Sequence, residues 1–406
     1  MKLSVVICVY NTKKSLLEEC LSSLSLSTVP TEEREIIVVD DGSETECRDI
    51  AFRFGARYER LGHVGTLAAR LHGVMLAQGE YITFVDSDDT LSFNYHLPML
   101  NRAEEGYDIV FNAWAFHSAG TRYFCTDDDS VSGSVESAEP LKAFLLREGR
   151  QHCYYVLWNK IYRAEILKLA ARELLDTAPP RPFCFSEDTL INLFAFKHAR
   201  RITSVRSGFY FYRIHSEQTV NITSKERLIY QINCMSYTLG RCKDTVSGRS
   251  DERALLRKID GWASLMARGH FANAKSGGYA ELYPYIKSAY GVAELAPPTR
   301  RDSAIYENVR LLPSNSREVE AALLSLYAEG GTIKVKRPRR GGYAELLLYG
   351  LSLIGREIIY GRKYPALPRE RIPLIKRIIF NPTVRRIGAL IFKKGSRARA
   401  FLKRFI

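Results

Sequence analysis

Apolar runs and helical patterns alternate over the first 90 residues of the chain. Continuous β-branched and apolar runs at 3–10, 35–40 and 81–86 are typical of strands that are covered on both faces. The clearest helical pattern between them spans about 66–78 and ends at a glycine. This alternation of strands and helices predicts an α/β domain with a mostly parallel sheet.

Two capping boxes predict where the first two helices begin. Ser15 with Glu18 forms the first box, and Ser43 with Glu46 forms the second. In such a box the hydroxyl and the carboxylate each accept a backbone N–H at the start of the helix. We therefore expect one helix to begin at Ser15 and another at Ser43.

The pattern becomes mostly helical in the second half of the chain. Strands are expected at 107–116 and 203–213, and a helix is expected at 187–199. From about residue 225 onward the apolar positions follow helical spacing. The expected helices lie at 225–242, 251–273, 279–290 and 317–328.

Basic residues are concentrated in the last fifth of the chain. The formal net charge is +14, and residues 331–406 hold 20 Lys and Arg but only 3 Asp and Glu. This leaves 39 basic and 42 acidic residues in 1–330, a near-neutral body that argues against a nucleic-acid partner. We expect three parts: an α/β domain at 1–222, a helical accessory region at 223–330 and a basic amphipathic tail at 331–406.

The tail alternates short apolar stretches with Lys and Arg. The stretches at 344–354, 372–380 and 387–392 have basic residues at their margins, which suits helices that lie on an anionic membrane surface. No run approaches the ~18–20 apolar residues that a spanning helix needs. A solvated appendage or an oligomer contact is the alternative.

The cysteine pattern indicates a reducing compartment. None of the eight cysteines lies in a CxxC pair, and several sit in apolar runs, as expected of buried free thiols. The N-terminus shows no signal-peptide pattern. We therefore expect a cytoplasmic protein, peripheral at the inner face of the cytoplasmic membrane.

Each of the three buried strands is followed by polar residues, at 10–11, 40–43 and 86–89. Ligands bind at the carboxyl ends of strands in open α/β sheets. The two carboxylates of Asp86 and Asp88, two residues apart, can converge on one hard cation such as Mg²⁺ or Mn²⁺. An Asp-rich loop or helix start without a ligand is the alternative.

Three segments resemble glycosyltransferase family 2. They are SVVICVYN at 4–11, EIIVVDDGS at 35–43 and GEYITFVDSDD at 79–89, and their spacing and order match too. The resemblance is strong over 1–115 and extends to about residue 220. It implies the GT-A fold, a Rossmann-like α/β domain, followed here by a helical C-terminal region.

The resemblance also implies a function. Members of the family are metal-dependent inverting glycosyltransferases that move a sugar from a nucleotide-sugar donor, usually UDP-linked. The acceptor would be a glycan or a lipid-linked molecule in cell-surface polysaccharide synthesis. The alternative is a non-catalytic nucleotide-sugar-binding scaffold tethered to the membrane by its basic tail. A nucleotidyltransferase is disfavoured because residues 11–14 lack a glycine-rich loop.

Carried over by this resemblance, the first two polar strand ends bind the donor nucleotide. Tyr10, with Cys8 and Val9, would line the base pocket, unless Tyr10 is a half-buried core aromatic. Asp41, with Asp40 beside it, would accept a hydrogen bond from the uracil.

The resemblance assigns the third strand end to the diphosphate and the metal. Asp86 would meet the ribose or the metal, Ser87 would lie on the donor side, and Asp88 would ligate Mn²⁺ or Mg²⁺ directly. The metal would neutralise charge on the departing diphosphate. Arg70 matches the arginine of the family's ARN-like helix and would approach the base or phosphate, although Leu71 replaces the usual asparagine.

Two further strings resemble family motifs. Trp158, Asn159 and Lys160 begin a WNK(L/I)(F/Y)R string assigned to the donor-sugar and acceptor region, with a core role for Trp158 as the alternative. Arg213 would pair with phosphate, for which guanidinium geometry is favourable. His215 would ligate the metal or touch the diphosphate, and a surface histidine is the alternative.

The family's ED motif is represented by Glu187 and Asp188 at the predicted start of a helix. An inverting transferase needs one general base for the acceptor hydroxyl, and a helix N-terminus keeps a carboxylate ionised. The resemblance assigns Asp188 as the base and Glu187 to the acceptor site. Ordinary acidic residues in a first helical turn are the alternative.

Overall fold

The computed structural model of the chain describes ten stretches, all within its first 311 residues. They are 1–91, 93–112, 114–119, 122–127, 139–146, 152–180, 182–205, 210–214, 224–295 and 309–311. Met1–Leu312 forms one compact unit, and Pro313–Ile406 forms a second. The expected helix at 317–328 and the basic tail therefore lie outside the described residues. The division at 222 and 330 stays a prediction.

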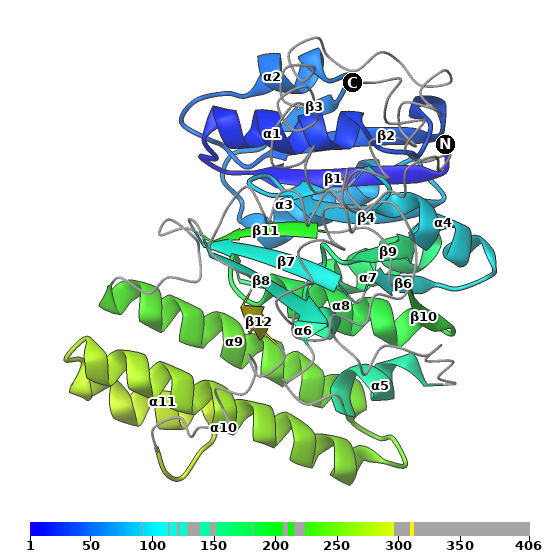
Figure 1. Ribbon diagram of the computed structural model, residues 1–406. Helices are drawn as coiled ribbons and strands as arrows, with labels where there is room; N and C mark the ends of the chain where they lie inside the picture. Colours follow the sequence, from blue (N-terminus) through cyan, green and yellow to red (C-terminus); the bar gives the residue numbers. More distant parts are fainter. Residues whose placement is uncertain are drawn as a thin grey trace, which may run out of the picture. The chain divides into compact units, whose positions relative to one another are not determined.

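A seven-stranded sheet lies at the centre of the first unit, in the order β10-β6-β9-β4-β1-β2-β3 (Figure 1). Neighbouring strands pair in parallel except β9, which runs antiparallel to β4 and β6. This confirms the prediction of an α/β domain with a mostly parallel sheet. The strands are β1 (Leu3–Val9), β2 (Arg34–Asp40), β3 (Arg57–Arg60), β4 (Tyr81–Asp86), β6 (Ile109–Asn112), β9 (Lys160–Arg163) and β10 (Ile202–Val205).

A second, five-stranded sheet has the order β12-β8-β7-β11-β5. The single strands expected at 107–116 and 203–213 are each two strands, one in each sheet, so these predictions were wrong. Polar residues inside both segments were passed over: Asn112 lies within 107–116, and Arg206, Ser207 and Gly208 lie within 203–213. The strands are β5 (Thr90–Leu91), β7 (Trp114–Ala119), β8 (Arg122–Asp127), β11 (Tyr210–Ile214) and β12 (Val309–Leu311).

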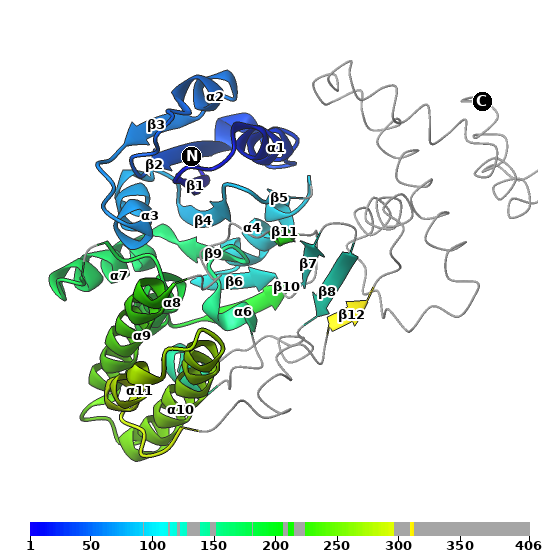
Figure 2. The same cartoon turned by 90° about the vertical axis from the view of Figure 1, so that its left-hand side faces the viewer.

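Helices cover both faces of the central sheet (Figure 2). Apolar side chains of α1 and α4 join the core on one face of β1, while α3 packs on its other face against Val6. The helices are α1 (Lys14–Ser25), α2 (Arg48–Arg53), α3 (Thr66–Leu76), α4 (His96–Glu104), α5 (Pro140–Leu146), α6 (His152–Tyr155), α7 (Ala164–Asp176) and α8 (Glu187–His198).

The second capping box does not open a helix, because α2 begins only at Arg48. Ser43 is used in the turn after β2, where its N–H donates to Asp40 at 2.8 Å and its Oγ accepts the N–H of Asn11 at 2.9 Å. The first helix begins at Lys14, one residue before the predicted Ser15, without a side-chain cap.

Three helices follow β11 in the chain, as the helical spacing predicted. They are α9 (Lys225–Val246), α10 (Glu252–Ser276) and α11 (Tyr283–Tyr290). They pack against one another, and α9 also packs against α8 (Figure 1). These helices therefore belong to the same compact unit as the sheet. In the described part of the chain, no helix has the length and apolar character needed to cross a bilayer.

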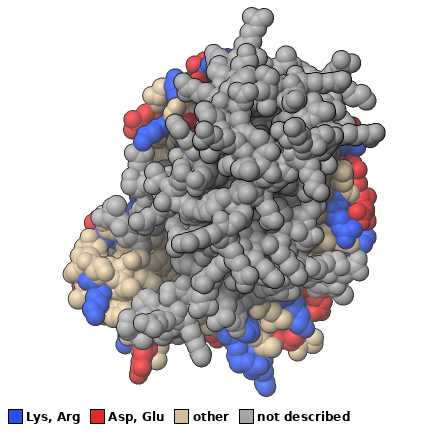
Figure 3. Space-filling model, viewed as in Figure 1, with Lys and Arg blue, Asp and Glu red and all other residues tan. Residues whose placement is uncertain are grey.

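The surface of the described residues mixes charges of both signs. In Figure 3 basic and acidic side chains lie next to each other along the visible margins of the face. This agrees with the near-neutral composition of residues 1–330. The described cysteines whose side chains are placed are free thiols, as their sequence pattern predicted.

Gly73 sets how closely α3 approaches the sheet. A Cβ at Gly73 would lie 2.4 Å from Cγ1 of Val6, a side chain that is buried in β1. The close contact between α3 and β1 requires glycine here because the neighbouring atom belongs to a short, branched side chain with little freedom to move.

We predict that Gly73→Ala lowers the free energy of unfolding by about 1–2 kcal/mol, because overpacking outweighs the better helix propensity of alanine. Gly240→Ala is the matched control, since Gly240 lies in α9 and a Cβ there would meet nothing within 4 Å. This control is expected to raise stability by about 0.5–1 kcal/mol. Urea unfolding measures both, and equal effects of the two substitutions would contradict the packing argument.

Candidate active site

The carboxyl ends of β1, β2 and β4 meet at one edge of the central sheet. Cys8 of β1 lies opposite Val39 on one side and Asp86 on the other, and Val9 lies opposite Asp40. The polar residues that follow these strands are therefore neighbours in space, as the strand pattern predicted. This edge is where an open α/β sheet binds its ligands.

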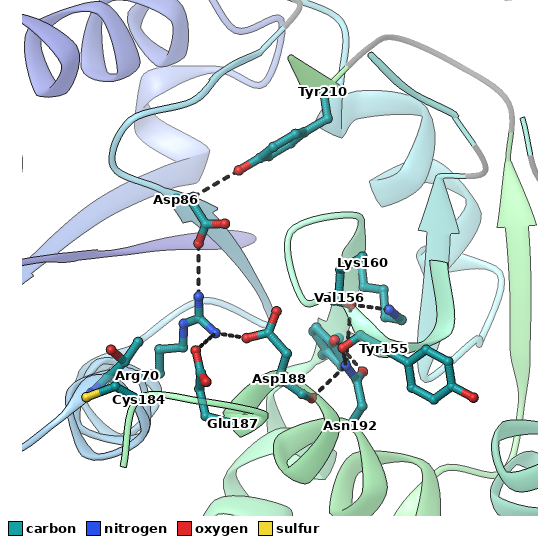
Figure 4. A network of polar contacts seen from close by, with 12 residues as sticks. Arg70, Asp86, Tyr155, Val156, Lys160, Cys184, Glu187, Asp188, Asn192 and Tyr210 are labelled. Carbon is teal, nitrogen blue, oxygen red and sulfur yellow. Dashed lines mark hydrogen bonds and ion pairs between the residues drawn. The ribbon is translucent and has the colours of Figure 1, made fainter. Parts of the chain in front are cut away.

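Arg70 of α3 is the centre of the polar network at this edge (Figure 4). Its Nη2 lies 2.9 Å from Oδ1 of Asp86, at the end of β4. Its Nη1 lies 3.1 Å from Oε1 of Glu187 and also donates to Oδ1 of Asp188, both in the first turn of α8. Only 7% of Arg70 is exposed. One guanidinium thus joins two acidic motifs that lie about a hundred residues apart in the sequence.

The charged groups at this site shift one another's pKa values. Burial raises the pKa of Asp86 to about 6; the nearby Arg70 opposes this rise, and the carboxylates of Asp88 and Glu187 add to it. Burial lowers the pKa of Arg70, but the surrounding carboxylates outweigh this effect and the net shift is upward. The site holds more acidic than basic groups, which is an environment that attracts a cation.

The helix α8 presents its two acidic residues from a firmly held first turn. Nδ2 of Asn192 donates to the carbonyl of Asp188 at 2.9 Å and to that of Tyr155 at 2.8 Å (Figure 4). The side chain of Glu187 is 12% exposed and that of Asp188 is 25% exposed. Asp188 is therefore the acidic residue of this turn that solvent or an acceptor reaches more easily.

Leu71, which stands where the family usually has asparagine, is part of the apolar interior. It is 1% exposed and lines a small apolar crevice with Leu67 and Phe183. The departure from the family pattern therefore adds packing between α3 and the segment that leads into α8.

Asp40 and Asp41 stabilise turns around the first two strand ends. Asp41 is 3% exposed, and its carboxylate accepts the N–H groups of Val64 at 2.6 Å and Gly65 at 2.9 Å. Asp40 accepts the hydroxyl of Tyr58 at 2.6 Å, and this bond helps lower its pKa although burial alone would raise it. The assignment of these two residues to uracil stays a prediction.

Tyr10 lies at the surface of this edge, not in the core. It is 50% exposed, and its ring stacks on that of His63 with centroids 4.3 Å apart. His63 lies in the left-handed backbone region, with Nδ1 3.3 Å from the carbonyl of Asp41. Val9 is buried. Cys8 as a residue is partly exposed, but burial of its thiol raises the pKa of that group to about 12. The two rings form an exposed flat surface next to Asp41.

The acidic turn after β4 is held by β11. The N–H of Asp86 donates to the hydroxyl of Tyr210 at 3.0 Å. Arg213 donates from its backbone to Asp89 at 2.7 Å and from Nε to the carbonyl of Asp88 at 3.1 Å. Tyr210 and Arg213 therefore fix the backbone that carries the predicted metal ligands.

Arg213 and Ser87, two predicted donor-binding residues near this turn, are bonded to other side chains. Arg213 also pairs with Glu19 at 2.6 Å, so its contact with phosphate stays a prediction. Oγ of Ser87 lies 2.7 Å from the hydroxyl of Thr12, which follows β1. His215 lies outside the described residues.

The WNK string lies behind the site and supports it. Trp158 is 3% exposed and stacks on Tyr210 with ring centroids 4.3 Å apart, as the core alternative foresaw. Lys160 is fully buried, and its Nζ donates to Oδ1 of Asn159 at 2.9 Å and to the carbonyl of Val156. The assignment of this string to donor binding stays a prediction.

Sequence reasoning missed His63, which comes from the loop before α3, where nearby glycines were the only signal of an unusual backbone. It included Tyr210 in the string at 210–215 that resembles a family strand, but assigned it no role. The bond from the N–H of Asp86 to the Tyr210 hydroxyl is a long-range contact that no local pattern reveals.

The donor set fits a divalent metal bound together with phosphate. Across the described stretches, no group of three or more His, Cys, Asp or Glu side chains is placed to hold an ion. Mg²⁺ commonly uses only one or two protein carboxylates and takes its other ligands from substrate phosphates and water. Asp86 and Asp88 are a pair of carboxylates of the kind that such a site uses, and metal binding by them stays a prediction.

The mostly parallel sheet, the acidic turn at its carboxyl edge and the acidic helix start beside it are the features of a GT-A type of fold. Residues 4–168 match the model of glycosyl transferase family 2. The resemblance to this family seen in the sequence is thus confirmed over these residues.

Known relatives point to the same family. The uncharacterized glycosyltransferase EpsJ of Bacillus subtilis is 29% identical over 228 residues, which cover 55% of this chain and 64% of EpsJ. The poly(ribitol-phosphate) beta-glucosyltransferase of Bacillus spizizenii is 40% identical over 117 residues, 27% of this chain and 18% of the relative. This chain thus spans less than two thirds of either relative.

A solved structure confirms the GT-A fold. Residues 1–349 of TarS from S. aureus, in complex with UDP-GlcNAc, superpose with a TM-score of 0.52 at 20% identity. The match covers 90% of this chain and 93% of that structure. At this identity the likeness speaks for the fold alone.

We predict that Arg70→Met lowers the free energy of unfolding by about 3–5 kcal/mol near pH 7.5, because buried carboxylates lose their counter-charge. The loss should shrink near pH 5.5: burial already raises the pKa of Asp86 to about 6, and without the opposing arginine it rises further above its unfolded value, so protonation at the lower pH offsets more of the lost counter-charge. Urea unfolding at both pH values measures this.

Arg163→Met is the control for that substitution, since Arg163 pairs with Asp108 at 3.1 Å with 26% of its side chain exposed. Removing a partly solvated pair of this kind is expected to cost about 1 kcal/mol. A loss at Arg70 that is no larger than this, or that is the same at both pH values, would contradict the buried-network interpretation.

Proposed function

We propose that the chain is an inverting glycosyltransferase that moves a sugar from a UDP-linked donor to a glycan or lipid-linked acceptor. The observation that carries this proposal is the Arg70 network, which places Asp86, Glu187 and Asp188 around one guanidinium at the carboxyl edge of the sheet. A donor-side and an acceptor-side carboxylate are thereby brought to the same point.

The proposed chemistry assigns each acidic motif one task. Asp188 accepts the proton of the acceptor hydroxyl while that oxygen bonds to the anomeric carbon and the bond from this carbon to the diphosphate breaks. Attack from the face opposite the diphosphate inverts the anomeric centre. Glu187, beside the base, would contact the acceptor. The 25% exposure of the Asp188 side chain supports its access to an acceptor.

Asp88, together with Asp86, would hold Mn²⁺ or Mg²⁺, which supplies charge neutralisation to the departing diphosphate. Arg70 fixes the Asp86 carboxylate beside that position through its 2.9 Å contact. Arg213 and Tyr210 hold the backbone of the same turn, so the carboxylates are positioned before a donor binds.

The donor nucleotide would bind on the exposed rings beside Asp41. Tyr10 offers a flat aromatic face, on which a base can stack. The complex of TarS with UDP-GlcNAc supports a UDP-linked donor for this fold. The name of the Bacillus spizizenii relative, a poly(ribitol-phosphate) beta-glucosyltransferase, supports a cell-surface polymer as the setting.

We predict that the purified chain releases UDP from at least one donor of a UDP-sugar panel with Mn²⁺, and that a chelator abolishes the release. Asp188→Asn should lower transfer by about 10²–10⁴-fold while UDP affinity is kept, because the amide cannot accept the proton. Asp88→Ala should lose the response to Mn²⁺.

Asp49→Asn is the control for these variants, because Asp49 is an exposed carboxylate of α2 that takes none of the proposed roles, and it should keep wild-type transfer. Normal transfer by Asp188→Asn would refute the base assignment, and an unchanged Mn²⁺ response in Asp88→Ala would refute the metal assignment. UDP binding without turnover of any donor would favour the non-catalytic scaffold.

The basic tail is proposed to hold the enzyme on the inner face of the cytoplasmic membrane. Its net charge of +17 contrasts with the −3 of residues 1–330, whose described surface mixes both signs. Basic residues near an anionic surface contribute roughly 1 kcal/mol each. The tail is therefore the part of the chain with the charge to bind such a surface.

Removal of residues 331–406 is expected to abolish co-sedimentation with vesicles that contain anionic lipid, while donor hydrolysis in solution changes less than about twofold. Vesicles of neutral lipid serve as the control and should bind neither form. Equal sedimentation of the truncated and full-length chains with anionic vesicles would show that the tail is not the membrane anchor.

A further inference from the structure

The segment 182–186, which leads into the acidic start of α8, is held between two helices. On one side it contacts the beginning of α3, the helix that carries Arg70. The N–H of Leu67 donates to the carbonyl of Phe183 at 2.9 Å, and the N–H of Thr66 approaches Sγ of Cys184 at 3.4 Å. A Cβ at Gly65, where φ is +93°, would lie 2.4 Å from the nitrogen of Phe183. The segment thus sits directly on the α3 backbone.

The other side of the segment is held by α9. The hydroxyl of Tyr230 accepts the N–H of Cys184 at 2.6 Å and donates to the carbonyl of Pro182 at 3.2 Å. One side chain of the helical region therefore satisfies two backbone groups of the segment. A phenylalanine at the same place would leave both without this partner.

A second side chain of α9 reaches the residue just before the acidic pair. The hydroxyl of Thr238 donates to the carbonyl of Cys234 at 3.1 Å, so its proton is used within α9. Its oxygen, 2.7 Å from Oγ of Ser186, therefore accepts the proton of the serine. The serine side chain is directed toward α9 by this bond.

Ser186 is in a conformation that needs such support. Its φ of 60° and ψ of 13° lie in the left-handed region, which costs a serine about 1–3 kcal/mol. The carbonyl of Ser186 nevertheless accepts the first helical bond of α8, from the N–H of Leu190 at 3.1 Å. The direction in which Glu187 and Asp188 leave the backbone thus depends on a strained residue that α9 holds.

We infer that Tyr230 and Thr238 are positioning residues of the active site, through which α9 sets the placement of the Asp188 carboxylate against Arg70. This inference rests on the proposed function of Asp188 as the base. The helices after residue 224 are therefore a part of the catalytic unit. The side chain of Ser186 is bonded to α9, whereas α3 contacts Phe183 and Cys184 earlier in the segment.

The test compares Tyr230→Phe and Thr238→Val with two matched controls on the same helix. Tyr237→Phe removes a hydroxyl that bonds to Thr177 instead, and the ring contact with Phe183 is kept. Thr245→Val removes a hydroxyl that bonds to the carbonyl of Arg241, within α9 itself.

We expect the double variant Y230F/T238V to lower kcat by about 10–100-fold, because a shift of about 1 Å in a catalytic group has effects of this size. KM for the donor and the affinity for UDP should change less than about twofold, because the donor edge is untouched. The acidic limb of the pH–rate profile should move to higher pH as Asp188 loses its fixed contact with Arg70. Both controls should keep wild-type values.

Hydrogen exchange supplies a readout that does not depend on turnover. The amides of 184–190 should exchange faster in Y230F than in Tyr237→Phe, because the N–H of Cys184 loses its acceptor. If the wild-type chain transfers sugar and Y230F/T238V has the same kcat, the inference is overturned while the proposed function stands. A wild-type chain that turns over no donor would overturn the proposed function and the inference together, even if exchange is faster.

Discussion

The burial of one arginine among three carboxylates is the constraint on which the site depends. Arg70 can be 7% exposed only because Asp86, Glu187 and Asp188 surround its guanidinium, and the carboxylates tolerate their own burial because it is there. The geometry of the acidic groups therefore follows from where α3 places one side chain. Gly73, which lets α3 approach β1 closely, is part of the same arrangement.

Around this network the chain uses its remaining elements as supports. The loop before α3 is tied to Asp41, and β11 holds the turn that carries Asp86 and Asp88. The helical region after residue 224 holds the segment before α8 through Tyr230. Tyr210, Nε of Arg213 and Tyr230 bond to backbone groups, so they set the positions of the acidic residues without using their carboxylates.

Much of the fold was readable from local patterns. The buried strands at 3–10, 35–40 and 81–86 and the helix at 187–199 appear where the pattern placed them, because burial on both faces of a parallel sheet leaves a continuous apolar run. Predictions failed where a local signal had a competing use. The Ser43 box was such a case, because the serine bonds to the strand-end turn instead of a helix.

The sequence by itself determined the α/β class, the family and the acidic residues at the strand ends, since all of these depend on residues near one another in the chain. Only the tertiary structure decided that Arg70 joins the two acidic motifs, that His63 stacks on Tyr10 and that α9 supports Ser186. These contacts join residues that are 16 to 117 positions apart. Such pairings are set by how helices pack on the sheet, which no local pattern of polar and apolar residues specifies.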